Sequence, residues 1–200
     1  MDGKDKCQEK IVKVLGMIWS VDDDRISLCD LKKTIETYNL TKRLMLQQIA
    51  LIFDPLGLFV PVIIRFKIII QDVWKEKTDW DEKVSENVSR KWDKIKKDLS
   101  VLSSIKIKRC INCLYDNSHY ELITFTDASK RAYAVAVYLR IITGNDIQVN
   151  LVYAKARLAP IKGVSIPRLE LLGVLIGCRV SAFVVEQLDI PNITQILLTD

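Results

Sequence analysis

Three acidic residues in the second half of the chain stand where an apolar segment begins or ends. Asp127 follows the strand-like run ELITFT, and Asp200 follows ITQILLT. Glu170 lies near the start of SIPRLELLGVLIGCRV, which has the apolar pattern of a buried helix. Carboxylates that converge repel one another unless a cation neutralises them, and Mg²⁺ prefers such oxygens. The three residues are therefore candidate ligands and catalytic groups of a site for Mg²⁺ or Mn²⁺.

The order of the expected elements shows how these residues could meet. Three strands (121–126, 132–140 and 147–160) precede a helix (165–188) and a last strand (192–200). A meander followed by a crossover helix can place the last strand beside the first and parallel to it. Asp127 and Asp200 would then end neighbouring strands, and Glu170, in the first turn of the helix, could point toward the same edge. Alternation in the third strand predicts one shared face for Ile147, Val149, Leu151 and Tyr153.

The preceding segment has a helical pattern. Apolar residues recur at helical spacing over 42–53, 62–76 and 85–102, and Thr41 is the expected N-cap of the first helix. Residues 11–28 instead suggest two short strands around an Asp-rich turn. The predicted fold class is α/β, of the α+β kind: a helical segment followed by a mixed sheet with a crossover helix.

Composition excludes several classes of protein. Of the 200 residues 49% are hydrophobic, which indicates a folded chain and not a disordered one. The first ten residues are polar, so no signal peptide is expected, and the apolar stretch LFVPVIIRFKIII is too short and too interrupted to span a membrane. Five cysteines at irregular positions suit a reducing compartment. We therefore expect an intracellular chain, cytoplasmic or nuclear, without a membrane partner.

Two other patterns carry weaker signals. Cys110 and Cys113 form a C-x2-C pair near His119, but only the distant Cys178 could complete a zinc site. The net charge of +5 permits a polyanionic partner without demanding one. Lys94 and Lys97 on the third expected helix, and Lys130 and Arg131 after Asp127, are candidate nucleic-acid contacts. A solvated surface explains the first two equally well, and two basic residues in a turn are more often simply exposed.

Several long motifs resemble the pol polyprotein of BEL/Pao-type LTR retrotransposons. In chain order they are KVLGMIW, RLMLQQIALIFDPLGLFVPV, QDVWKEKTDWDE, FTDASKRAYAVAVYLR, AKARLAP and SIPRLELLGVLIGCRV. They cover most of residues 13–200 in the order of that family, whose region is often labelled the Pao retrotransposon peptidase. The resemblance implies the end of a reverse transcriptase palm-like region at 1–40, a helical thumb- or connection-like segment at 41–109, and a ribonuclease H-like domain at 110–200, truncated at its fourth strand.

The resemblance also implies roles for the three carboxylates. Asp127 of TDAS, Glu170 of PRLEL and Asp200 of LLTD match metal-binding residues of the family, which implies two-metal hydrolysis of RNA in RNA–DNA hybrids. Leu198 stands where the family usually has tryptophan, and a fourth carboxylate is expected downstream. The implied partners are nucleic acid and the rest of the pol polyprotein, with its reverse transcriptase palm and integrase. Residues 1–200 alone are expected to hydrolyse little or nothing.

Other functions stay open at this point. A degenerate remnant of a transposon could bind nucleic acid without catalysis. An aspartic peptidase, as the family label suggests, ranks lower because TDAS lacks the glycine of the usual Asp-Ser/Thr-Gly loop. An integrase core is disfavoured, because its glutamate follows both aspartates, whereas Glu170 lies between them.

Overall fold

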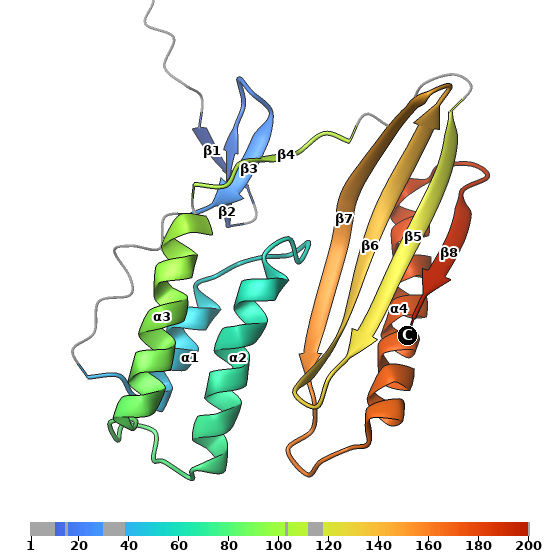
Figure 1. Ribbon diagram of the computed structural model, residues 1–200. Helices are drawn as coiled ribbons and strands as arrows, with labels where there is room; N and C mark the ends of the chain where they lie inside the picture. Colours follow the sequence, from blue (N-terminus) through green and yellow to red (C-terminus); the bar gives the residue numbers. More distant parts are fainter. Residues whose placement is uncertain (1–10, 15, 30–38, 103, 112–117, 200) are drawn as a thin grey trace, which may run out of the picture.

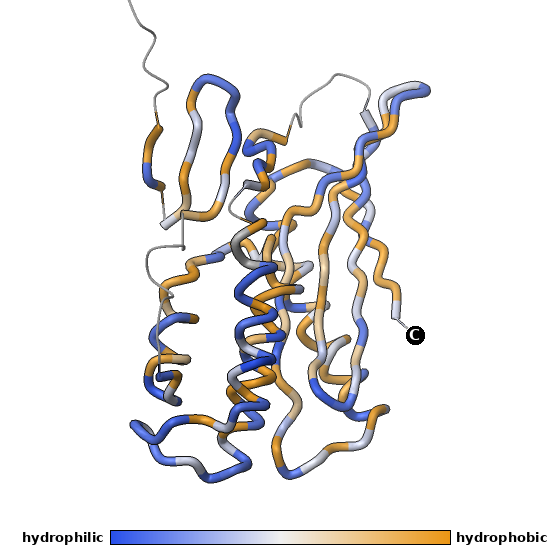
Figure 2. The backbone as a smooth tube through the Cα atoms, turned by 60° about the vertical axis from the view of Figure 1, so that its left-hand side comes forward, coloured by the Kyte–Doolittle hydropathy of each residue, from blue (hydrophilic) through white to orange (hydrophobic). Residues whose placement is uncertain are grey.

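The protein has a mixed α/β architecture with two four-stranded sheets and four helices in its described part (Figure 1). The computed structural model describes residues 11–14, 16–29, 39–102, 104–111 and 118–199. Apolar and polar residues alternate along the strands and recur along the helices (Figure 2). This patterning lets each element bury one face against its neighbours.

The first sheet is small and antiparallel. It contains β1 (Ile11–Val14), β2 (Met17–Ser20), β3 (Arg25–Leu28) and β4 (Ile107–Lys108), in that order. The expected acidic turn, between β2 and β3, is confirmed, but residues 11–28 contain three strands and not the expected two. Asp24 adopts φ 47° there, and its carboxylate accepts hydrogen bonds from Trp19 Nε1 at 2.9 Å and Arg109 Nε at 2.6 Å. These contacts join the turn to the segment after β4.

The helical unit consists of α1 (Lys42–Ala50), α2 (Val60–Lys75) and α3 (Glu86–Leu102). Thr41 is the N-cap of α1, as expected, and its Oγ1 accepts a hydrogen bond from the Leu44 N–H at 3.3 Å. The unit packs around the fully buried side chains of Met45, Phe66 and Trp92. Edge-to-face packing of Phe66 on Trp92, with ring centroids 4.7 Å apart, stabilises the contact between α2 and α3.

The second sheet contains β5 (His119–Ala128), β6 (Ala132–Thr143), β7 (Asp146–Leu158) and β8 (Thr194–Leu198). Its strand order is β7-β6-β5-β8, and β5 and β8 are parallel. The crossover between β7 and β8 is α4 (Ile166–Leu188), which covers one face of the sheet (Figure 1). The predicted meander, crossover and strand neighbours are therefore confirmed.

The expectation of a single apolar face in the third strand of this sheet is wrong. Val137 pairs with Tyr153, but its neighbour Tyr138 pairs with Leu151, so β7 contains one extra residue, Val152. This bulge reverses the alternation of side chains. The Tyr153 ring consequently packs with Phe183 of α4, with centroids 6.2 Å apart, whereas Leu151 lies on the opposite face.

The helical unit contacts the second sheet through the turn that precedes α2. The Ala154 N–H of β7 donates to the Leu56 carbonyl at 2.9 Å. Gly57 has φ +74°, and a Cβ on it would lie 1.8 Å from the Ala154 carbonyl oxygen. Glycine fits because it tolerates this backbone conformation and leaves room for β7.

Gly177 allows α4 to lie close to β5, whereas Gly173 marks a looser contact between the same elements. A Cβ on Gly177 would lie 2.5 Å from Thr126 Cγ2 and 3.3 Å from Leu197 Cδ1. A Cβ on Gly173 would make ordinary contacts, 3.7 Å from the Asp127 carbonyl oxygen and 3.8 Å from Thr126 Cβ. The helix therefore approaches the sheet most closely at Gly177.

We predict that Gly177→Ala lowers the free energy of unfolding by about 1–3 kcal/mol, because the added methyl group overfills the contact with Thr126. Gly173→Ala is the matched control. It should leave stability unchanged or raise it by up to about 1 kcal/mol, since alanine favours the helix. Urea unfolding followed by circular dichroism measures both values. Equal unfolding free energies for the two variants would contradict the close approach.

Candidate active site

Asp127 lies at the end of β5, where the strand turns toward β6. It pairs with Ala134 across the ladder, and its side chain is exposed. Its carboxylate accepts a hydrogen bond from the Ala128 N–H at 2.6 Å. Ser129 holds the turn, since its Oγ accepts from the N–H groups of Arg131 at 3.3 Å and Ala132 at 3.2 Å. The residues of TDASKR therefore present the Asp127 carboxylate on an ordered turn.

Glu170 lies in the second turn of α4, not in the expected first turn. The helix begins at Ile166, after the N-cap Ser165, so that Glu170 is its fifth residue. Gly173, one turn further along, packs on the backbone of Asp127. Residues three apart share a helix face, so Glu170 is on the side of α4 that approaches the end of β5.

Asp200 lies outside the described residues, so its position stays a prediction. The last described pair between β5 and β8 is Phe125 with Leu198. In the sequence, Asp127 and Asp200 stand two residues beyond these partners. In the described part of the chain, no three His, Cys, Asp or Glu side chains form a group that could hold a metal ion.

Asp127 and Glu170 differ in their partners from the described acids that pair with arginine. Among the described residues, neither Asp127 nor Glu170 forms an ion pair with Lys or Arg. By contrast, Asp24 and Asp81 each accept a hydrogen bond from an arginine, which lowers their carboxyl pKa. Hard oxygen donors without a protein counter-ion fit a divalent cation such as Mg²⁺.

Comparison with known proteins agrees with this arrangement. Residues 41–200 match the family described as the Pao retrotransposon-like RNaseH-like domain. The chain belongs to this family. The matched residues include both the helical unit and the second sheet. The resemblance to a retrotransposon pol region is therefore confirmed.

A solved structure has the same fold over most of the chain. It is the foamy viral protease–reverse transcriptase dRH in complex with double-stranded DNA, with a TM-score of 0.52 and 13% sequence identity. The match covers 94% of this Pao-family chain and 30% of the viral protein. No curated protein matches the chain. No described helix has the length and apolar character needed to cross a membrane.

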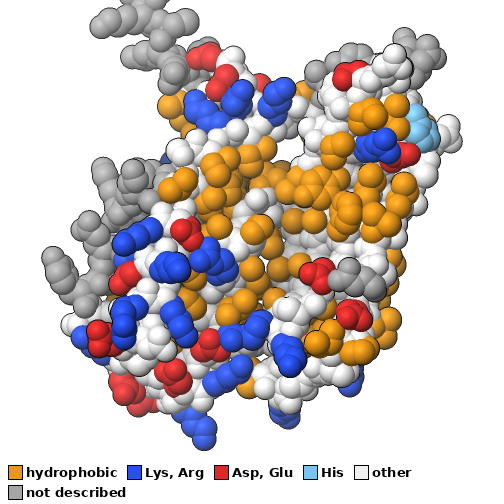
Figure 3. All heavy atoms as spheres, viewed as in Figure 1, with side chains coloured by type: hydrophobic (Ala, Val, Ile, Leu, Met, Phe, Trp, Pro, Cys, Tyr) orange, Lys and Arg blue, Asp and Glu red, His pale blue; other side chains and the backbone are white. Residues whose placement is uncertain are grey.

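The basic residues expected near nucleic acid fall into two groups. Lys94, Lys97 and Lys130 are exposed, and Lys and Arg side chains gather over the helical unit (Figure 3). Arg131 is engaged within the chain, because its guanidinium donates to Asp72 Oδ1 at 2.7 Å and to the Ile68 carbonyl at 3.4 Å. The sequence does not reveal this pairing, since the two partners lie on different elements.

A mainly apolar cleft of 230 Å³ lies beside Asp127. Leu58, in the turn before α2, and Pro61, in the first turn of α2, form one wall. Phe125 and Tyr138, on the open face of the sheet, form the other. The rings of Phe125 and Tyr138 pack edge to face, with centroids 5.8 Å apart. The sequence did not predict this wall, because it indicated only that the segment between the expected helices 42–53 and 62–76 is not helical.

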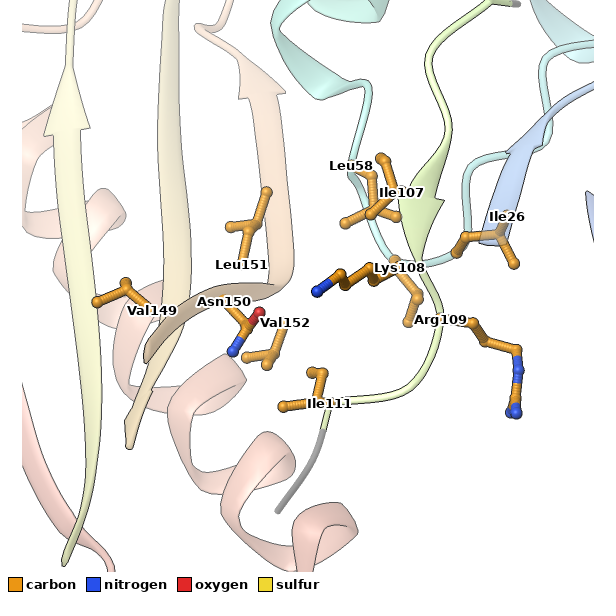
Figure 4. Close-up of a pocket in the computed structure, with 11 residues that line it drawn as sticks. Ile26, Leu58, Ile107, Lys108, Arg109, Ile111, Val149, Asn150, Leu151 and Val152 are labelled. Atoms are coloured by element: carbon orange, nitrogen blue, oxygen red, sulfur yellow. The ribbon is translucent and has the colours of Figure 1, made fainter. Parts of the chain in front are cut away.

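A second cleft, of 320 Å³, separates β4 from β7 (Figure 4). Lys108 and Asn150 point into this space, whereas Arg109 points away from it (Figure 4). Arg109 instead pairs with Asp24 at 2.6 Å. None of the candidate metal ligands lines this cleft, so it is separate from the candidate active site.

Asp54 holds the wall of the first cleft in place. Its carboxylate accepts hydrogen bonds from the N–H groups of Leu58 at 2.9 Å and Phe59 at 2.8 Å, at the start of α2. Burial raises the pKa of the Asp54 carboxyl above its usual value of 3.8, although the bonds from Phe59, Leu58 and Gly57 oppose that rise. The folded protein therefore binds a proton at Asp54 more readily than the unfolded chain does.

We predict that the stability difference between the wild type and Asp54→Asn falls as the pH rises from about 4 to about 7. A raised pKa in the folded state means that Asp54 contributes most stability when protonated. Asp81→Asn is the matched control with the opposite sign, because a hydrogen bond from Arg43 lowers the pKa of Asp81. Its difference should rise with pH below about 4.5 and then level off. Urea unfolding across this pH range measures both stability differences. Equal slopes of the two differences against pH would contradict the burial of Asp54.

Proposed function

We propose that this chain carries three metal-binding carboxylates of a ribonuclease H-like domain, and that this domain hydrolyses the RNA strand of RNA–DNA hybrids. The observation that carries the proposal is the packing of α4 on the backbone of Asp127 at Gly173, one helical turn from Glu170. The parallel pairing of β5 with β8 adds support, because it directs the segment that ends in Asp200 toward the same edge. Family membership agrees with this activity.

The proposed site uses Asp127, Glu170 and Asp200 as ligands for Mg²⁺ or Mn²⁺. When bound, a pair of such ions supplies an activated water and stabilises the leaving oxygen of a phosphodiester. The chain itself contributes the orientation of the ligands. The Ala128 N–H and the Ser129 turn hold Asp127, and the body of α4 holds Glu170.

The proposed substrate is a hybrid duplex, and the proposed partners include the palm and integrase parts of the pol polyprotein. The foamy viral protein of similar fold is in complex with double-stranded DNA, which supports a nucleic-acid ligand in general. Lys130 lies in the turn after Asp127, where a phosphate near the metal site would be within reach of a long side chain. Lys94 and Lys97 on α3 would contact a more distant part of the duplex. An intracellular location is part of the same proposal.

The peptidase alternative receives less support from the fold. The two described carboxylates belong to β5 and to α4, and α4 is the crossover helix that leads from β7 to β8, the parallel neighbour of β5. A retroviral-type aspartic protease is a small all-β dimer whose two aspartates share a proton, and that arrangement leaves no place for α4. Non-catalytic binding of nucleic acid is the competing outcome of the cleavage experiment.

We predict that Asp127→Asn lowers the rate of metal-dependent hybrid cleavage at least a hundredfold, because even outer-shell partners of metal ligands cost about 10–100-fold. The assay follows a labelled RNA strand in a hybrid, with Mg²⁺ or Mn²⁺, using this chain joined to the following region of a Pao-family pol polyprotein. Glu170→Gln should behave similarly, and Asp146→Asn, at the first residue of β7, is the control. Binding of the hybrid without cleavage in the wild type would favour the non-catalytic alternative.

We also predict that Lys130→Ala and Lys94→Ala each reduce the salt dependence of hybrid binding. Removal of one phosphate contact should lower the slope of log K against log salt by about 0.9. Lys13→Ala, on β1, is the control and should leave the slope unchanged. Fluorescence anisotropy at several salt concentrations measures these slopes. Identical slopes for all four proteins would show that the lysines do not contact phosphate.

A further inference from the structure

Two neighbouring residues of α2 bind the two loops at the Asp127 end of the second sheet. Gln71 Nε2 donates to the Ala159 carbonyl at 2.7 Å, and both residues are buried, with 7% and 4% of their surface exposed. Asp72 Oδ1 accepts from the Arg131 guanidinium at 2.7 Å. The helical unit therefore binds the loops of the second sheet through two adjacent residues, Gln71 and Asp72.

The two loops are also bonded to each other. The Ala159 N–H donates to the Arg131 carbonyl at 2.9 Å. Gln71, Ala159, Arg131 and Asp72 thus form a closed ring of contacts, called here the α2 clamp. In this ring, each loop has one bond to α2 and one bond to the other loop. Moving one loop alone breaks both of its bonds, and moving the two loops together breaks both bonds to α2.

The guanidinium of Arg131 depends on this ring for its hydrogen bonds. Its Nε atom is buried without a hydrogen-bond partner in the described part of the chain. Asp72 and the Ile68 carbonyl, both on α2, accept from another nitrogen of the same group. A partly buried cation of this kind is held in place by its charged partner, since leaving it unpaired is costly.

Each loop of the α2 clamp leads directly to one candidate metal ligand. Arg131 lies in the turn that follows Asp127 and is fixed by Ser129. Ala159 begins the segment that leads to α4 and so to Glu170. The α2 clamp consequently holds the segment after Asp127 and the segment before Glu170, and it contributes no ligand to the candidate site.

We propose that the α2 clamp sets the spacing of Asp127 and Glu170, so that the helical unit controls the metal affinity of the site. The proposal rests on the proposed function and deepens it: Gln71, Asp72 and Arg131 are positioning residues. Arg131 then acts through Asp72 and not by binding a phosphate.

The test compares Asp72→Ala and Gln71→Met with the wild-type chain. Hydrogen exchange of the backbone should quicken about tenfold in 128–132 and 159–165, and the affinity for Mn²⁺, measured by titration calorimetry, should fall about tenfold. Asp72→Glu keeps the charge and should restore both. Asp98→Ala is the matched control, because it removes a comparable ion pair of α2, between Arg65 and Asp98, that lies within the helical unit.

The outcomes separate the clamp from the metal site. Unchanged exchange in both segments of Asp72→Ala and Gln71→Met overturns the proposal. Faster exchange with unchanged Mn²⁺ affinity also overturns it, provided that Asp127→Asn weakens Mn²⁺ binding. If Asp127→Asn has no effect on Mn²⁺, the proposed function fails and the control of metal affinity falls with it, whereas the exchange rates still show whether the clamp holds the loops.

Discussion

The close packing of α4 on β5 is the contact on which the arrangement of the candidate site depends. Gly177 lacks the side chain that would hold the helix away from Thr126, and at Gly173 the helix lies beside the backbone of Asp127. Because the helix crosses the sheet at this distance, the start of α4 reaches the end of β5. The two described carboxylates belong to elements that are far apart in the chain, and this packing is what relates them.

The helical unit is joined to the second sheet by a few specific contacts. The turn before α2 bonds to β7 at Ala154, and the α2 clamp bonds to the loops at the Asp127 end of the sheet. The first contact places the partly buried carboxylate of Asp54 beside the cleft, where the bonds from Leu58 and Phe59 offset its desolvation. The unit that precedes the sheet is therefore part of the surroundings of the candidate site.

Much of this fold could be predicted because apolar residues recur in its elements with the period of a strand or of a helix. The alternation in 132–140 and the long apolar helix of 165–188 indicated a meander and a crossover, and the strand order follows from these. The bulge at Val152 was not predicted, although the alternation of apolar residues shifts by one position there, from 147, 149 and 151 to 154, 156 and 158. Asp127 and Glu170 were recognised as candidates from their places at the ends of apolar segments.

Contacts between distant elements explain what the sequence did not reveal. Asp72 and Arg131 are both common surface residues, and only the packing of α2 beside β7 brings them together. The wall that residues 57–61 form beside the cleft depends on the same packing. Local patterns predict elements and their order, whereas such pairings arise from the tertiary arrangement.

The central claim is that the end of β5 and the start of α4 form one cation site. The most direct measurement is a titration of the isotopically labelled chain with Mn²⁺, whose unpaired electrons broaden nearby amide signals in NMR spectra. The account predicts that the signals of Ala128 and of the first two turns of α4 broaden first, and that Asp127→Asn abolishes the effect. Broadening that begins instead at the acidic turn of Asp22–Asp24, or that is unchanged in Asp127→Asn, would contradict it.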